Sequence, residues 1–298
     1  MTTFIDKAQT KIVQSVHIGS RLDACALALF PSLGTRSQAK KWIKKGYIVQ
    51  NGHKANPARF VNIGDTVTLQ PAAILPKPLD IPLEFAFEDS HIAVVNKPAG
   101  LFVRGRHPKT LVRALRQHAM LSTETDALAF VQPVHRLDQR TSGLVVCAKT
   151  KSTQVALGKA FETRQVQKKY HAIVCGHLGS GESTTPIEGK DAHTSWYPLQ
   201  HVRSLHTDWL TVLEVQIQTG RTHQIRRHLS EIGHPILGDD LYTEGPVLKS
   251  KGLFLCATYL SFAHPVHQLP LTCHITPPDK FQNQLTRESQ RWTKYHSE

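Results

Sequence analysis

Apolar residues in the first quarter of the chain recur at helical spacing and then give way to short alternating runs. The spacing predicts one helix over residues 21–30 and a second that is capped by Ser37 and ends at Gly46. The dipeptide Asn51-Gly52 between two strand-like runs predicts a tight hairpin. These elements form a small helix-helix-sheet unit. Prolines 71, 76, 78 and 82 then mark a semi-rigid linker.

The rest of the chain is dominated by apolar runs of strand length. Strands are expected at residues 92–95, 129–134, 144–148 and 165–174, and strict alternation predicts a half-buried strand around residues 213–217. Helices are expected at residues 111–119 and from Lys151 or Ser152 through Arg164, and a third should begin at a Thr222 cap. Residues 176–208 are rich in Gly, Ser and Thr and read as hairpins and loops, while the stretch from Asp279 reads as a polar tail.

Composition adds a strong positive charge to this picture. The 298 residues contain 36 Lys and Arg against 23 Asp and Glu, which gives a net charge of +13, so the expected partner is a polyanion. Nucleic acid is favoured over a membrane surface because the chain lacks a basic amphipathic segment with a strong apolar face. The N-terminus has no apolar core of signal-peptide length, and no run is long enough to span a bilayer.

The cysteines and histidines give no sign of a metal site. The five cysteines are widely spaced without a Cys-x-x-Cys pair, which suits buried thiols in a reducing compartment and makes a zinc ribbon improbable. Eighteen histidines are present, but His223 and His228 are five residues apart and no His-Glu-x-x-His motif occurs. We therefore expect a cytoplasmic protein without a bound metal.

The candidate chemistry lies in the turn-prone segment of residues 134–144, between two strand-like runs. Asp138 is surrounded there by His135, Arg136 and Arg140. Nearby positive charge favours the ionised form of a carboxylate, which can then serve as a base or nucleophile. The same pattern also suits a structural ion pair in a turn.

Two long motifs resemble the RluA family of RNA pseudouridine synthases. They are HRLD at residues 135–138, followed by TSGL at 141–144, and GRTHQIR at 220–226, continuing as GHPILGD at 233–239. The resemblance implies that Asp138 is the essential catalytic residue and that Arg221 pairs with it. Lys168-x-Tyr170-x-Ala172 matches the family's tyrosine motif, which implies that Tyr170 reaches the active site.

Three further positions follow from the same resemblance. The stretch NKPAGL at residues 96–101 resembles the first family motif, but Lys97 is given no catalytic role. Leu255, in the last motif, either packs near the target base or belongs to the plain core, and Cys256 stands where the family has histidine. Arg140 occupies a position where the family often has an acid, and with His135 and Arg136 it is a candidate RNA contact.

Residues 20–70 resemble an S4 RNA-binding domain, a small fold of the α-L type. Arg36, Lys40 and Lys44 recur every four residues and form a cationic helix face. Such a stripe is often only a solvated face, but within this pattern we expect it to bind RNA phosphates, which would position RNA without reading its sequence.

The combined prediction is an α+β protein with an S4 domain at residues 18–72, a linker at 73–82, a catalytic domain at 83–278 and a tail at 279–298. The catalytic domain should contain a mixed, largely antiparallel sheet flanked by helices. The expected function is cofactor-free conversion of uridine to pseudouridine in large-subunit ribosomal RNA, by a monomer that acts on a flipped-out base. Transfer RNA remains an alternative substrate, and a noncatalytic RNA-binding or ribosome-assembly protein is the rival class. Hydrolysis by Ser142 is excluded because no Gly-x-Ser-x-Gly elbow is present.

Overall fold

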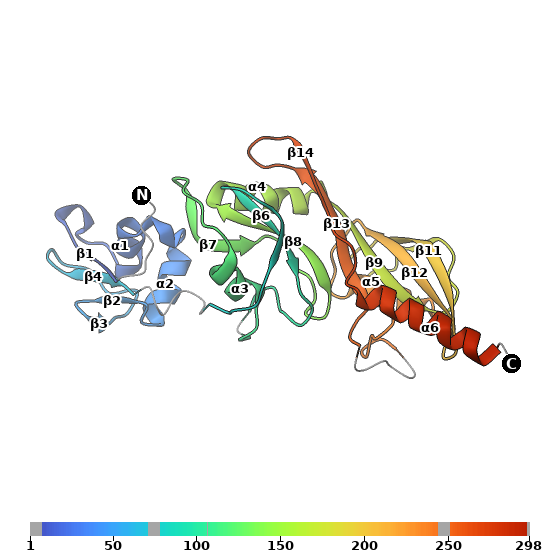
Figure 1. The fold of residues 1–298 in the computed structure, drawn as a ribbon. Helices are drawn as coiled ribbons and strands as arrows, with labels where there is room; N and C mark the ends of the chain where they lie inside the picture. Colours follow the sequence, from blue (N-terminus) through green and yellow to red (C-terminus); the bar gives the residue numbers. More distant parts are fainter. Residues whose placement is uncertain (1–7, 71–77, 106, 244–250, 297–298) are drawn as a thin grey trace. The chain divides into compact units, whose positions relative to one another are not determined.

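The computed structural model describes residues 8–70, 78–105, 107–243 and 251–296. The chain forms two compact units, residues 1–77 and 78–298 (Figure 1). Half of the expected linker, residues 73–77, lies outside the described residues. Leu79 is already part of the second unit, because its amide donates to the carbonyl of Arg113 at 3.0 Å. The second unit therefore begins a few residues before the expected start at Leu83.

The N-terminal unit packs two helices on one small antiparallel sheet. The helices are α1 (Leu22–Leu29) and α2 (Arg36–Lys44), and the sheet has the order β1-β4-β2-β3 with bounds Gln9–Ile12, Thr66–Leu69, Ile48–Gln50 and His53–Lys54. Short 3-10 turns lie at Ser15–His17 and Pro31–Leu33. The predicted hairpin is confirmed, since Asn51 and Gly52 both adopt positive φ between β2 and β3. The predicted cap of α2 is wrong: Thr35, not Ser37, accepts the amide of Gln38.

The second unit is built on a ten-stranded, largely antiparallel sheet, which confirms the α+β class. Its main path runs β10-β11-β12-β9-β13-β8-β6-β5, with β14 beside β13 and β7 beside β8. The bounds are β5 Glu84–Glu88, β6 Ile92–Lys97, β7 Ala127–Pro133, β8 Ser142–Thr150, β9 Gln167–Cys175, β10 Gly181–Ser183, β11 Thr194–Ser204, β12 Asp208–Ile217, β13 Leu255–Ala263 and β14 Pro270–His274. Four helices accompany the sheet: α3 (Leu111–His118), α4 (Lys151–Glu162), α5 (Gln224–Glu231) and α6 (Lys280–His296).

Strands β8 and β13 meet in a short parallel contact that joins the two halves of this sheet. Only two residue pairs form it, Ser142 with Cys256 and Gly143 with Ala257. Gly143 has φ +116°, and a Cβ there would lie 2.2 Å from the carbonyl oxygen of Ala257. The TSGL motif therefore needs glycine at this point because the neighbouring backbone leaves no room for a side chain.

Two regions are more ordered than the sequence indicates. Residues 176–208, expected to be hairpins and loops, contain the eleven-residue strand β11, whose burial does not alternate regularly. The expected polar tail forms α6, which lies across the β9-β11-β12 half of the sheet (Figure 1). Ser204 donates to Glu288 at 2.9 Å, and Phe281 and Leu285 are buried. The helix belongs to the second unit because its apolar face packs into the core of that unit. None of the helices in the described ranges is long and apolar enough to cross a membrane.

Candidate active site

The loop of residues 134–141 is anchored at both ends. The amide of Val134 donates to the carbonyl of Val146 at 3.0 Å. At the other end, the ammonium of buried Lys97 donates to the carbonyls of Pro98, Leu101 and Gln139 at 3.0, 3.0 and 3.3 Å. Burial lowers the pKa of Lys97 to about 8, although the charge of Asp138 opposes the shift. Lys97 thus ties the NKPAGL stretch to the loop that carries Asp138, which agrees with a structural role.

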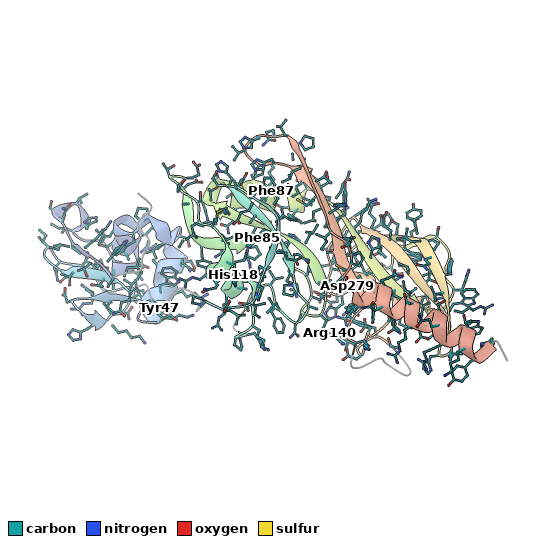
Figure 2. The ribbon with its side chains drawn as sticks, viewed as in Figure 1. Tyr47, Phe85, Phe87, His118, Arg140 and Asp279 are labelled. Carbon is teal, nitrogen blue, oxygen red and sulfur yellow. The ribbon has the colours of Figure 1, made fainter. Side chains whose placement is uncertain are left out.

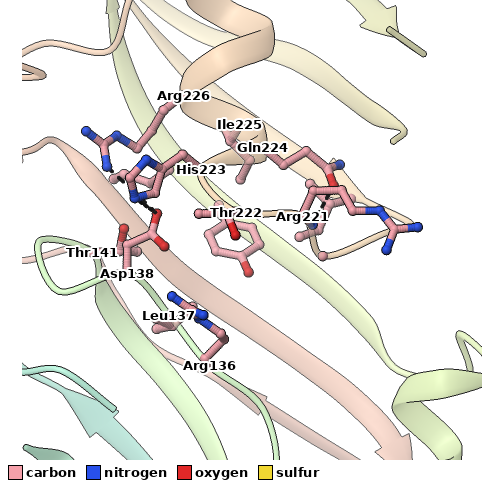
Figure 3. Close-up of a pocket in the computed structure, with 14 residues that line it drawn as sticks. Arg136, Leu137, Asp138, Thr141, Arg221, Thr222, His223, Gln224, Ile225 and Arg226 are labelled. Carbon is pink, nitrogen blue, oxygen red and sulfur yellow. Dashed lines mark hydrogen bonds and ion pairs between the residues drawn. The ribbon is translucent and has the colours of Figure 1, made fainter. Parts of the chain in front are cut away.

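Asp138 lies in a hollow that is lined by four segments of the chain: the β7–β8 loop, β9, the end of β12 with the start of α5, and β13. Its Oδ2 atom is 3.8 Å from Nε2 of His223 and 3.9 Å from Nη1 of Arg226 (Figure 3). The side chain of Asp138 is 18% exposed, so it is accessible from the hollow. Asp138 is the only carboxylate among the residues lining this hollow.

Arg226 is held in place by a second carboxylate. Its Nε and Nη2 atoms donate to Oδ2 and Oδ1 of Asp239 at 2.7 and 2.8 Å, and both side chains are almost fully buried. Burial lowers the pKa of Arg226, but the hydrogen bonds and charge of Asp239 outweigh it and raise the pKa overall. The bidentate pair leaves Nη1 to face Asp138, and this geometry fixes the direction of the cation.

His223 forms the other side of this arrangement. It precedes α5 in the left-handed conformation, with φ 56°, and its Nδ1 atom lies 2.9 Å from the hydroxyl of Tyr242. Burial lowers its pKa, an effect that Arg226 reinforces and Asp138 opposes. His223 and Arg226 are three residues apart at the start of the helix, so both reach the same carboxylate.

The apolar wall of the hollow comes from two neighbouring strands. Tyr170 on β9 and Leu255 on β13 line the hollow and are 7% and 4% exposed. Burial, helped by the negative charge of Asp138, raises the pKa of the Tyr170 phenol. Tyr170 therefore remains a neutral ring with a hydroxyl, which suits stacking on a base.

Wider space adjoins this hollow on two sides. The part between Asp138, Tyr170 and Arg226 is narrow, about 80 Å³. One adjoining hollow of about 510 Å³ shares Asp138, His223 and Arg226 with it and extends to Phe102, Arg104 and Arg140. A second, of about 430 Å³, shares Tyr170 and Arg221 and extends to Phe161 and Lys168. The site is therefore a cleft with the carboxylate at its narrowest point.

Comparison with known proteins identifies the family. The model of RNA pseudouridylate synthase matches residues 91–231, and that of the S4 domain matches residues 33–67. A ribosomal large subunit pseudouridine synthase D from Xylella fastidiosa is 37% identical, over 85% of this chain and 84% of its own length. The chain belongs to the RNA pseudouridine synthase family. An RNA pseudouridine synthase from Aquifex aeolicus is 33% identical over 93% of this chain and 95% of its own length.

A solved structure agrees with this assignment. Human RNA pseudouridylate synthase domain containing 4 superposes with a TM-score of 0.55 at 26% identity, covering 68% of this chain and 92% of its own. The expected family, S4 domain and enzyme class are confirmed, and the chain is an RNA pseudouridine synthase, an isomerase.

The expected pairing of Arg221 with Asp138 is wrong. Arg221 lines the hollow, but its Nε atom donates to the carbonyl of Asp191 at 2.8 Å, and its guanidinium points away from Asp138 (Figure 3). The reason is the position of α5, which begins at Gln224 rather than at a Thr222 cap. Arg221 therefore lies in the preceding turn, and Arg226 takes the place beside the carboxylate. Two features of the sequence could have identified Arg226. It lies three residues after His223, and its partner Asp239 directly follows Gly238.

The candidate RNA contacts of the catalytic unit have different surroundings. His135 is not a cation: its Nε2 atom accepts the amide of Val146 at 3.0 Å, its ring stacks on Phe161, and burial lowers its pKa to about 3. Arg140 of the synthase (labelled in Figure 2) pairs with Asp240 and donates to the carbonyl of Gly238 at 3.1 Å. Arg136 is exposed and lines all three hollows, which keeps it available to RNA.

In the S4 domain, part of the cationic face is neutralised internally. Fully buried Asp23 lies 2.9 Å from Arg36, 3.7 Å from Lys40 and 3.9 Å from Arg21. Burial raises the pKa of Asp23, but the Arg36 hydrogen bond and the three cations outweigh it and lower the pKa overall. Lys44 is exposed and forms no ion pair within the described residues. Arg36 and Lys40 remain about half exposed, so they can contact RNA while they hold Asp23.

One group of potential metal ligands occurs in the described part of the catalytic unit. Donor atoms of Asp89, His264 and His267 lie within 4.8 Å of one another. However, Nδ1 of His264 accepts the amides of Val266 and His267 at 3.3 and 3.2 Å, so Nε2 carries the proton that it donates to Asp89 at 2.9 Å. Both nitrogens of His264 are thus used to join the β5–β6 and β13–β14 turns, and this arrangement does not suit a metal ligand.

Proposed function

We propose that this synthase converts specific uridines of large-subunit ribosomal RNA to pseudouridine, with Asp138 as the catalytic carboxylate. Relatives named ribosomal large subunit pseudouridine synthase D, 31–37% identical over most of the chain, support this RNA class. The observation that carries the catalytic assignment is the position of Asp138, the one acid lining a hollow that it shares with Arg226 and Tyr170. Transfer RNA remains the alternative substrate.

The reaction breaks a nitrogen–carbon glycosidic bond and rejoins the same ring through carbon, without redox change or an external donor. Asp138 supplies the carboxylate that acts on the nucleoside, and Arg226 orients it. Tyr170 offers a stacking surface for the uracil ring, and Leu255 closes the wall beside it. Enclosure by these side chains retains the detached base until the new bond forms.

A uridine in folded RNA reaches Asp138 only after it leaves its stack. Unstacking costs a few kcal/mol, which favours loops over continuous duplex. Cations around the cleft, with Arg136 at its centre, compensate by binding the backbone on either side. We assign the exposed face of Arg36, Lys40 and Lys44 in the S4 domain to phosphate binding that adds affinity without sequence readout.

The decisive experiment is carbodiimide mapping of pseudouridine in RNA from cells with and without the protein, applied to ribosomal and transfer RNA in parallel. Purified Asp138→Asn protein should yield no product in a single-turnover assay on the mapped RNA. Asp208→Asn makes the same chemical change at an exposed, left-handed position at the start of β12, and it should retain wild-type activity. Full product formation by Asp138→Asn would refute the catalytic assignment.

The proposal also includes a cytoplasmic, monomeric enzyme that uses no cofactor. Sedimentation of the purified protein with and without an RNA fragment tests the oligomeric state. Activity of protein dialysed against a chelator, with RNA as the only other component, tests the absence of a cofactor requirement.

A further inference from the structure

Beside the active site lies the second adjoining hollow, which we call the flanking hollow. It is lined by twelve residues, among them Arg136, Arg164, Lys168 and Arg221, and has a volume of about 430 Å³. Arg136, Tyr170 and Arg221 line both this hollow and the space around Asp138. A chain that places a nucleoside against Tyr170 therefore has the flanking hollow directly beside it.

The charges in the flanking hollow are not balanced. Four cations line it, and Glu162 is its only acid. Within the described residues, none of these four forms an ion pair with a carboxylate, and Arg221 instead donates to a backbone carbonyl. The neighbouring strand residue Lys169 shows the contrast, because it pairs with Glu214 at 2.9 Å. The flanking hollow thus brings Lys168, on the face of β9 that carries Tyr170, together with three further cations that have no carboxylate partner within the described residues.

Lys168 makes this imbalance costly. It is half-buried, on the same face of β9 as Tyr170, and its ammonium lies 5.9 Å from the centre of the Phe161 ring. Burial lowers the pKa of Lys168, and the nearby charge of Arg164 lowers it further. An unpaired, partly desolvated cation beside a second cation is unfavourable unless an anion binds there.

The backbone of Arg164 supports the same conclusion independently. Helix α4 ends with the amide of Gln165 bonded to the carbonyl of Ala160 at 2.9 Å, and Arg164 occupies the left-handed position with φ 60°. Glycine is the favoured residue at this point of a helix end because a side chain is strained there. Strained positions of this kind cluster at functional sites. Because the side chain of Arg164 lines the flanking hollow, the strained backbone at this residue is consistent with a function in that hollow.

We propose that the flanking hollow binds the backbone phosphate of the nucleotide next to the target uridine, through Lys168 and Arg164 with Arg136 and Arg221 at the rim. This inference rests on the proposed function for the position of the uridine. Phosphate is the anion that an RNA chain presents on either side of a flipped base, and two cations about a cavity can bind its oxygens without reading sequence.

The first test compares charge-removing variants at this hollow with a matched control. Lys168→Gln and Arg164→Gly should each raise the half-saturating concentration of an RNA stem-loop carrying the mapped uridine about tenfold, and change the rate at saturation less. Each should also reduce the slope of log affinity against log salt by about 0.7. Arg164→Gly removes the backbone strain, so unfolding cannot explain its loss. Lys159→Gln, on the exposed face of the same helix, should match wild type.

The second test locates the phosphate. Stem-loops are made with an uncharged methylphosphonate in place of each phosphate near the uridine, one at a time, and binding is measured by fluorescence anisotropy. One adjacent replacement should weaken wild-type binding about tenfold and weaken Lys168→Gln binding little further. The proposal would be overturned if, at every position, the affinity lost through the methylphosphonate simply added to the affinity lost through Lys168→Gln. Unchanged RNA binding by Lys168→Gln and Arg164→Gly would also overturn it. This experiment measures RNA binding and not isomerisation. If one methylphosphonate weakens binding as expected but no pseudouridine forms, only the proposed function is contradicted.

Discussion

Asp239 binds Arg226 through the guanidinium nitrogens that do not face Asp138. Its two oxygens bind Nε and Nη2 of the guanidinium at 2.7 and 2.8 Å, while Nη1 lies 3.9 Å from Asp138. The backbone amide of Leu241 also donates to Asp239 at 3.0 Å, and this hydrogen bond fixes the position of the Asp239 carboxylate. Under the proposed function, Asp239 is therefore a positioning residue that acts on Asp138 through Arg226.

Replacing Asp239 with asparagine should lower the single-turnover rate about a hundredfold, because the amide cannot hold the guanidinium at both nitrogens. The half-saturating RNA concentration should change much less, since Asp239 is buried away from RNA. Breaking a buried ion pair should also cost about 3–5 kcal/mol of unfolding free energy. Urea unfolding and single-turnover kinetics measure the two effects. An unchanged rate in the folded variant would contradict the positioning role.

The two arginines of the GRTHQIR motif should respond differently to the same substitution. Arg226→Gln removes the cation beside Asp138 and should reduce the single-turnover rate by about 10² to 10³-fold. Arg221→Gln leaves that cation in place, so its effect should fall on RNA affinity. Rate measurements at saturating RNA, with circular dichroism as a check on folding, compare them. A larger rate loss for Arg221→Gln would restore the pairing inferred from family resemblance.

The contact at Gly143 should tolerate no side chain. Gly143→Ala places a Cβ 2.2 Å from the Ala257 carbonyl at φ +116°, and should cost about 3 kcal/mol or more of unfolding free energy. Gly158→Ala is the matched control, because Gly158 lies within α4 with nothing near its ideal Cβ. It should gain about 0.5–1 kcal/mol. Equal stability of the two variants in chemical denaturation would argue against a tight contact between β8 and β13.

Acid should weaken the fold through His135. Its pKa is about 3 in the folded protein against an ordinary value of 6.5, so the unfolded chain binds the extra proton between these values. Stability from this group is complete above pH 6.5 and is lost as the pH falls toward 3. The loss should reach about 2 kcal/mol by pH 5. His135→Gln keeps an acceptor for the amide of Val146 and should flatten the dependence of the unfolding free energy on pH in this range. A dependence identical to that of the wild type would refute the assignment to His135.

Local pattern was enough to place Asp138 on a loop and Tyr170 on a strand, because the apolar runs around them are plain. Their meeting in one site was implied by the family resemblance, and both line the hollow as expected. Arg226 was missed because its role depends on where α5 begins and on Asp239, thirteen residues further along. The length and bounds of β11 were not predicted because its burial does not alternate regularly, although hairpins were expected there. Helix α6 was missed because its apolar positions are diluted by polar ones. These features depend on tertiary partners, which local propensity does not contain.

The parallel contact of β8 with β13 also determines how the enzyme can vary. Asp138 enters the cleft from the β7–β8 side, whereas Tyr170, Leu255 and Arg226 come from β9, β13 and the helix after β12. The carboxylate of Asp138 and the apolar wall of Tyr170 and Leu255 thus belong to opposite halves of one sheet, and within the described residues β8 and β13 pair only through the two-residue parallel contact. A shift of one half against the other would therefore move Asp138 relative to Tyr170, Leu255 and Arg226, so substitutions at Gly143 or Ala257 can change the cleft without touching any residue that lines it.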